Sequence, residues 1–182
     1  APAACTRPVA GLIVNGVTNL FEDLPGNQLA VSAAEVVAAN DGYSIQVIYS
    51  NDWYVDAENG NDAALGYFPS CAKKTMAAAL SNANLTAYDV VHALPGIYDT
   101  GVMLRDPGDE TGTRAVVPAN ITLVADAGPE VTHIVGAAPT GTVEFEDSGY
   151  QMGLGAVRCV YLHDGAKVKN FTLRNGSTRA DD

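Results

Sequence analysis

WYVDAENGND, residues 53–62, changes over a short distance from apolar and aromatic side chains to turn-forming ones. The apolar part predicts a short strand that ends at Asp56. Residues of the second part either accept positive φ or hydrogen-bond to their own backbone, so a tight polar turn is expected there. These turn residues are Asn59, Gly60, Asn61 and Asp62.

The next periodic segment is TMAAALSNA, residues 75–83, which predicts one short helix. Its apolar positions follow the i, i+3, i+4, i+7 spacing of a single helix face, and Thr75 is the expected N-cap. The members of that face are Met76, Ala79, Leu80 and Ala83. Because the face is narrow and made mostly of small side chains, we expect this helix to lie close against the open end of stacked strands.

A second strand is predicted at Tyr88–Ala93, and the turn residues Pro95 and Gly96 end it. The whole order resembles the opening of the pectin-lyase-like superfamily, which begins with a Tyr-Val-Asp strand, an Asn-Gly-Asp turn, a Lys-Thr helix and a Pro-Gly-x-Tyr turn. The matching positions here are 54–56, 59–62, 74–75 and 95–98, while 69–73 departs from the pattern. The resemblance implies an all-β fold, a right-handed parallel β-helix forming a short solenoid with an N-terminal capping α-helix.

Beyond Gly101, short apolar runs bounded by Gly, Pro, Asn or Asp recur, as expected of successive coils. They lie at 115–117, 121–125, 131–135, 143–145, 157–162 and 167–173. In the last run, apolar and polar residues alternate, but Phe171 and Leu173 follow a phase displaced by one residue from that of Val168. Asn170 at the break can adopt a left-handed conformation and turn the chain between two strands. An antiparallel sandwich of the same strands is the alternative, although it gives no reason for the order of elements in 53–101.

The predicted solenoid portion covers residues 53–182, preceded by an N-terminal extension or cap at 1–52. Within the extension we expect strands at Val9–Val14 and Ile45–Tyr49, a small helix at Val31–Asn40 and a turn at Leu24–Asn27. The small residues that open the sequence suit a mature terminus after signal cleavage. This predicts a secreted or cell-surface protein.

The sequence has three cysteines, so one sulfur is left over from any internal pairing. An extracellular setting suggests a Cys5–Cys71 bridge that ties the extension to the cap. Cys159 alternates with Val157 and Tyr161, which predicts a buried, unreactive thiol.

A formal net charge of −11, with ten Lys and Arg, argues against nucleic acid as a partner. No apolar run approaches the roughly 20 residues that cross a membrane. An acidic polysaccharide stays open as a partner, because Lys167 and Lys169 are expected to share the outward face of one strand, with Arg158 on an adjacent coil.

No cofactor is predicted, and Ca²⁺ is the one metal considered. Its candidate ligands are Asp56, Asn59, Asn61 and Asp62, but Gly60 stands one place earlier than in an EF-hand loop, which favours a plain turn. His92, His133 and His163 lack a recognisable nucleophile partner and are interpreted as strand or turn residues. Glu144 and Glu146 share one strand face, where an exposed pair of carboxylates is the simpler interpretation than glycoside hydrolysis.

Two functions follow as hypotheses. The first is a secreted or cell-surface β-helix, noncatalytic in this segment, with a structural, adhesive or self-associating role, such as an adhesin or filament subunit. Its open C-terminal end would present unpaired backbone groups to another strand. The second is the N-terminal part of a polysaccharide lyase or glycoside hydrolase acting on acidic polysaccharide, since such enzymes carry their catalytic groups on middle coils.

Overall fold

The computed structural model describes residues 5, 7–14, 17–20, 45–104, 111–144 and 151–178. The chain divides into two compact units, Thr6–Ser50 and Ala1–Cys5 with Asn51–Asp182. The sequence predicted a boundary between residues 52 and 53, whereas the structure places the boundary between residues 50 and 51 and assigns Cys5 to the larger unit. The predicted helix at Val31–Asn40 and turn at Leu24–Asn27 lie outside the described residues.

The smaller unit contains a three-stranded antiparallel sheet in the order β2-β1-β3. Its strands are β1 (Val9–Val14), β2 (Val17–Leu20) and β3 (Ile45–Tyr49). Both strands predicted in this segment are therefore present with the expected bounds. Arg7 lies 5.7 Å from the centre of the Tyr49 ring and donates from Nε to the Ser50 carbonyl at 3.1 Å, which connects the two ends of this unit.

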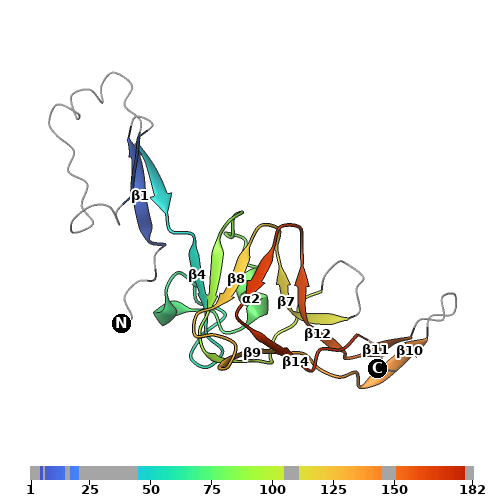
Figure 1. The fold of residues 1–182 in the computed structure, drawn as a ribbon. Coiled ribbons are helices and arrows are strands. Elements are labelled where there is room, and N and C mark those ends of the chain that lie inside the picture. The colour runs from blue at the N-terminus through green and yellow to red at the C-terminus, as the bar shows by residue number, and fades with distance from the viewer. Residues whose placement is uncertain are drawn as a thin grey trace, which may run out of the picture. The chain divides into compact units, whose positions relative to one another are not determined.

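The larger unit is mainly β, with parallel sheets and little helix (Figure 1). Its early elements are β4 (Asp52–Val55), the 3₁₀ helix η4 (Pro69–Cys71), the helix α2 (Met76–Leu80), β5 (Val90–Ala93) and β6 (Gly96–Tyr98). The next are β7 (Gly112–Val117), β8 (Thr122–Ala125) and β9 (Thr132–Val135). The last are β10 (Gly141–Glu144), β11 (Gln151–Leu154), β12 (Val157–Leu162), β13 (Lys167–Lys169) and β14 (Thr172–Arg174).

Three parallel sheets run through this unit, in the orders β13-β8-β5-β4, β14-β9-β6 and β12-β7. The chain visits them in the same sequence twice, first as β7, β8 and β9 and then as β12, β13 and β14. We call this second group the last layer. All pairings within the three sheets are parallel, which contradicts the antiparallel-sandwich alternative for these strands.

The predicted coil strand at 143–145 is the exception. Val143 belongs to β10, which pairs antiparallel with β11 to form a hairpin between β9 and β12 in sequence. Local alternation is the same in both kinds of strand, so the sequence pattern did not distinguish a hairpin from a stacked strand. Residue 145 lies outside the described residues.

Matching register keeps apolar side chains in columns inside the unit. Trp53 pairs with Val91, Val91 with Leu123, and Leu123 with Val168. Strand neighbours alternate between the two faces of a sheet, so partners in register face the same way. The first three members of this column are at most 2% exposed and belong to the core cluster.

The corner predicted at Asn170 is confirmed, and two other asparagines share its left-handed backbone conformation. Asn170 has φ of 63° between β13 and β14, and Asn120 and Asn175 have φ of 61° and 56°. Tyr88 also has a positive φ, 76°, which is uncommon for a bulky side chain. Its N–H donates to the Asn120 carbonyl at 3.0 Å and its carbonyl accepts from the Asn51 amide at 3.2 Å. These two bonds hold the unusual conformation on both sides.

The helix α2 contributes Met76, Ala79 and Leu80 to the buried core. Thr75 caps it as predicted, because its hydroxyl accepts from the Ala78 N–H at 3.0 Å. The helix is shorter than predicted: it ends at Leu80, and Ala83 is exposed instead of completing the apolar face.

The outer edge of β4 is covered by the segment 66–73. Tyr54 donates to the Gly66 carbonyl at 2.7 Å and accepts from the Lys73 N–H at 3.0 Å, and Asp56 donates to the Lys73 carbonyl at 2.8 Å. Gly60 lies so close to the Asp56 and Lys73 carbonyls that a side chain there would collide with backbone. The outer backbone groups of Tyr54 and the N–H of Asp56 are therefore satisfied at this end of the stack.

Candidate functional site

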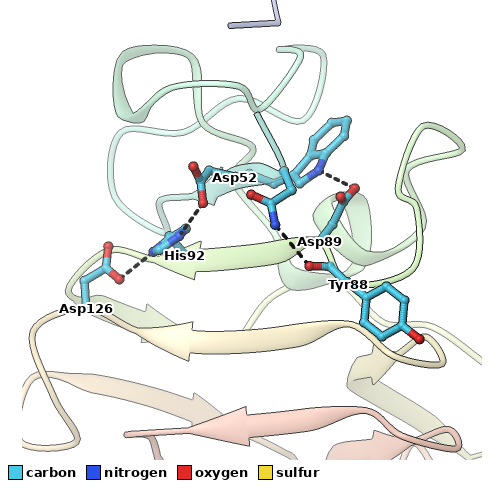
Figure 2. A network of polar contacts seen from close by, with 7 residues as sticks. Asp52, Tyr88, Asp89, His92 and Asp126 are labelled. Carbon is cyan, nitrogen blue, oxygen red and sulfur yellow. Dashed lines mark hydrogen bonds and ion pairs between the residues drawn. The ribbon is translucent and has the colours of Figure 1, made fainter. Parts of the chain in front are cut away.

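The outward face of the four-stranded sheet carries a histidine between two carboxylates (Figure 2). Asp52 opens β4, His92 lies in β5, and Asp126 follows β8 directly. The inward neighbours Val91 and Ala93 are fully buried, so alternation directs His92 outward. Three adjacent parallel strands thus bring together residues that lie far apart in sequence.

Both ring nitrogens of His92 are engaged. Nδ1 lies 2.8 Å from an Asp126 carboxylate oxygen, and Nε2 lies 3.2 Å from an Asp52 carboxylate oxygen. An ionised carboxylate only accepts hydrogen bonds, so both contacts are hydrogen bonds only when His92 carries both protons. The His92 side chain is 24% exposed, against 42% for Asp52 and 41% for Asp126. Solvent therefore reaches this cluster.

Tyr54 stacks on the His92 ring, with centroids 5.2 Å apart and planes at 22°. Their register partnership across β4 and β5 explains the stacking. Partial burial raises the pKa of the Tyr54 phenol, and the negative charges of Asp52 and Asp126 raise it further. His92 and the two carboxylates thus link three adjacent strands, and we call Asp52, His92 and Asp126 the polar clasp.

A separate network holds the start of β5 from inside. Asp89 is 2% exposed and accepts from Trp53 Nε1 at 2.8 Å (Figure 2). It also accepts from the Thr86 N–H at 2.9 Å and from the Thr86 hydroxyl at 3.0 Å. Three donors compensate the burial of this carboxyl group. Its inaccessibility gives it a structural role.

Three of the four Ca²⁺ candidates accept hydrogen bonds through their side-chain oxygens, and the fourth, Asn59, donates from its amide to Asp56 at 3.2 Å. Asp56 accepts from the Glu58 and Asn59 N–H groups at 2.9 and 3.1 Å, and Asn61 accepts from Ala63 at 2.9 Å. Asp62 accepts from the Lys74 and Thr75 N–H groups, both at 2.8 Å, and from the Thr75 hydroxyl at 3.0 Å. Among the described residues, no group of three or more His, Cys, Asp or Glu is arranged to hold a metal ion.

Burial by itself raises the pKa of Asp56, but its hydrogen bonds reverse that effect. Backbone donation from Asn59 and Glu58, the Asn59 amide at 3.2 Å and the charge of Lys74 together lower the pKa below its ordinary value. The ionised form of Asp56 therefore stabilises the turn that follows β4.

The cationic candidates lie on two different sheets. Lys167 and Lys169 are exposed on β13, with the half-buried Val168 between them. Arg158 lies on β12, half-buried, with its guanidinium 3.5 Å from the Thr111 carbonyl. The structure therefore brings the two lysines together and places Arg158 in the neighbouring sheet of the same layer.

Apolar side chains of the last layer are exposed where their partners are buried. Leu173 is 50% exposed and pairs with Ile134, which is 0% exposed. Leu162 is 46% exposed and pairs with Val117, also 0% exposed. Among the described residues, each strand of the last layer has a single parallel partner strand. In the described part of the chain, this layer therefore combines strands that have one parallel partner strand with exposed apolar side chains.

The structure joins Cys5 and Cys71 by a disulfide, with Cα atoms 6.3 Å apart. Cys159 is a free, buried thiol whose Sγ lies 3.2 Å from the Arg174 carbonyl. His133 contacts the Glu130 carbonyl at 3.2 Å, and His163 packs edge-on against Tyr161. Glu144 lies in β10, while Glu146 lies outside the described residues.

Sequence reasoning did not find the clasp. It interpreted His92 alone and gave no role to Asp52 or Asp126. The signal available was the shared outward phase of Asp52, Tyr54 and His92, but linking these residues requires the register of β4 on β5.

Within the described part of the chain, no helix has the length and apolar character needed to cross a membrane.

Comparison of this chain with protein-family models, curated proteins and solved structures finds no match.

Proposed function

We propose that the larger unit is the beginning of a right-handed parallel β-helix of the pectin-lyase-like type, with α2 as its cap. In this proposal the protein is secreted or at the cell surface. Its role is structural, adhesive or self-associating, and the last layer accepts a further β-strand.

The exposure of Leu173 carries this proposal. Its register partner Ile134 is completely buried, so Leu173 has the inward phase of a core residue while half of its surface meets solvent. A row of unpaired strand edges beside apolar side chains is a template for strand addition. Adding one strand to β14 would pair its outer backbone groups and cover Leu173 together.

The extracellular part of the proposal draws support from the Cys5–Cys71 disulfide, since disulfides persist in oxidising compartments. The repeated order of the three sheets and the buried face of α2 support the β-helix assignment.

The experiment is light scattering coupled to size-exclusion chromatography over a wide concentration range. We expect the apparent mass of the wild type to rise with concentration and Leu173→Asp to suppress the rise, because a buried unpaired carboxylate opposes docking. Leu65→Asp is the matched control, since Leu65 is 49% exposed but lies in the loop before the segment that covers β4. A wild type that stays monomeric throughout would overturn the proposal.

A second candidate is the N-terminal part of a polysaccharide lyase or hydrolase. The solvent-accessible His92, set between Asp52 and Asp126, is the observation that favours it. Screening uronate polymers for unsaturated-product absorbance, with His92→Ala as the comparison, tests it. Equal signals from the wild type and the variant would remove this candidate.

A further inference from the structure

The outer edge of β14 is defined by its bonds to β9. The Arg174 carbonyl accepts from the Gly136 N–H at 3.0 Å, so the backbone groups of Arg174 point toward β9. Successive residues of a strand direct their backbone groups to opposite sides, and the N–H and carbonyl of Leu173 therefore point away from β9. Among the described residues, β9 is the single partner strand of β14. Leu173 thus offers a donor and an acceptor to another strand.

A second copy of β14, running antiparallel, fits this edge. A twofold axis at Leu173 sets the two Leu173 residues opposite each other as a hydrogen-bonded pair, in which each N–H donates to the other carbonyl. The same register sets Thr172 opposite the second copy's Arg174, and this pair occurs twice. No like charges face each other. Residues directly opposite share one face, so the two Leu173 side chains, each 50% exposed, would cover each other.

The same arrangement on β13 is disfavoured by charge. The Lys167 N–H donates to the Ile121 carbonyl at 2.9 Å, so Val168 is the residue whose backbone groups point outward. Antiparallel pairing centred on Val168 sets Lys167 opposite the second copy's Lys169, again twice. Both lysines are exposed, and like charges directly opposite each other are destabilising. Lysines on an edge strand are a common protection against strand pairing, and β13 has that protection.

The outer edge of β12 is already contacted where the strand begins. Val157 exchanges both of its backbone hydrogen bonds with Ala137, at 2.9 and 3.0 Å, and its carbonyl also accepts from the Ser177 N–H at 3.3 Å. Neither residue belongs to β7, the parallel partner of β12. A strand added along the whole of β12 would have to displace these contacts. Of the three strands in the last layer, β14 is therefore the one best suited to pair with itself.

We propose that two copies of the chain bind each other through β14, antiparallel, with Leu173 at the twofold axis. This inference rests on the proposed function, because it names a second copy as the source of the strand that the last layer accepts. The two sheets β14-β9-β6 would join into one sheet of six strands. Because each copy uses the same surface, the assembly closes at two copies and does not grow further.

Cross-linking at the twofold axis tests the pairing. In a hydrogen-bonded antiparallel pair the Cα atoms are about 5.5 Å apart, within the range of about 4.4–6.8 Å that a disulfide spans. We expect Leu173→Cys to form an intermolecular disulfide under mild oxidation at least about tenfold faster than Leu65→Cys, the collision control, in which the native Leu65 is 49% exposed. Val168→Cys, the central position of β13, should react no faster than that control. Non-reducing electrophoresis measures the rates, and equal rates for Leu173→Cys and Leu65→Cys would overturn the inference.

A matched pair of charge variants tests the register. The Thr172 hydroxyl donates to the Pro129 carbonyl at 2.7 Å, and Thr172→Glu and Thr172→Arg both lose this bond. The introduced glutamate would face the second copy's Arg174 twice, whereas the introduced arginine would set like charges opposite each other twice. We expect Thr172→Glu to dimerise at least about tenfold more tightly than Thr172→Arg in light scattering. Circular dichroism of both variants separates a change in association from a change in folding.

Salt provides an independent measurement, because the last layer is basic. Between residues 155 and 178 the sequence has four cations, Arg158, Lys167, Lys169 and Arg174, and the single acid Asp164. Two copies joined through β14 bring these like-charged layers together. Raising the salt from 0.1 M to 1 M shortens the Debye length from about 10 Å to about 3 Å and screens the repulsion. We therefore expect dimerisation to strengthen severalfold, and weakening by salt would contradict the pairing.

Two further results would overturn the inference while leaving the proposed function intact. Association that is suppressed by Leu173→Asp but is equal for the two Thr172 variants would place the docking strand elsewhere in the last layer. An apparent mass that rises past two chains would contradict a closed pair. Wild-type protein that never associates would instead remove the proposed function itself.

Discussion

The two ends of the parallel stack have similar strands but different surroundings. At the β4 end, the segment 66–73 hydrogen-bonds along the strand, and α2 contributes Met76, Ala79 and Leu80 to the buried core. At the last layer, Leu173 and Leu162 keep the inward phase but are 50% and 46% exposed. The comparison teaches that burial in a stack of parallel strands depends on the neighbouring layer, because register alone orients a side chain without covering it.

The largest expected effect contrasts Ile134→Ala with Leu173→Ala. We expect the buried change to lower the free energy of unfolding by about 2–5 kcal/mol, as large-to-small core substitutions do. The exposed change should cost less than about 1 kcal/mol, because little buried area is lost. Urea denaturation at a dilute protein concentration measures both. Equal losses would mean that the last layer is covered.

The disulfide at the covered end is the next test. Cys71→Ser should lower stability by about 2–4 kcal/mol, because Cys5 and Cys71 are 66 residues apart and the bridge restricts a long loop in the unfolded chain. Thermal denaturation with and without reductant measures this. Reductant should destabilise the wild type and leave the variant unchanged, and a wild type indifferent to reductant would contradict the prediction.

The corner at Asn170 tests the backbone of the last layer. With φ of 63°, Asn170→Ala should cost about 1 kcal/mol, while Asn170→Gly should be nearly neutral. Urea denaturation of the pair isolates the backbone effect, since both variants remove the same side chain amide. A loss as large for Gly as for Ala would assign the effect to that amide instead.

Tyr88, near the covered end, allows a substitution that we expect to stabilise the fold. It is 76% exposed and has φ of 76°, so the side chain adds little packing while the backbone is strained. Tyr88→Asn should raise the free energy of unfolding by about 0.5–1 kcal/mol. Comparison of urea midpoints checks this, and a destabilised variant would show that the phenol contributes contacts that outweigh the strain.

The smallest effect concerns acid stability at the turn after β4. The pKa of Asp56 is lowered in the folded protein from the ordinary 3.8, so its stabilisation is complete above that value and is lost as pH falls through the folded pKa. Asp56→Asn should therefore flatten the loss of stability on acidification below about pH 4. Urea denaturation between pH 6 and about pH 2 measures the slope, and parallel curves would contradict the prediction.

The sequence predicted those parts of the fold that depend on neighbours along the chain. Thr75 caps α2, a hydrogen-bonded turn follows Asp56, and Asn170 turns the chain, all as expected. Each of these interactions spans only a few residues, so the local sequence is enough to predict it. The helix end at Leu80 was predicted less well, because packing against the strands decides how many turns are kept.

Contacts between distant strands could not be predicted in the same way. Asp52, His92 and Asp126 meet only because β4, β5 and β8 stack in one register, and a slip of one residue would turn His92 inward. The hairpin of β10 and β11 escaped prediction for the related reason that alternation does not specify a partner strand.

By itself, the sequence determined that short strands alternate with Asn and Gly turns, that one small helix follows Thr75, and that the chain is acidic. Only the tertiary structure decided that the strands stack in parallel, that His92 lies between two carboxylates, and that a layer of basic strands presents exposed leucines. The physical reason is the distance along the sequence between the residues that interact. Backbone conformation is set by side chains a few positions away, whereas register, burial and charge pairing depend on residues that only folding brings into contact.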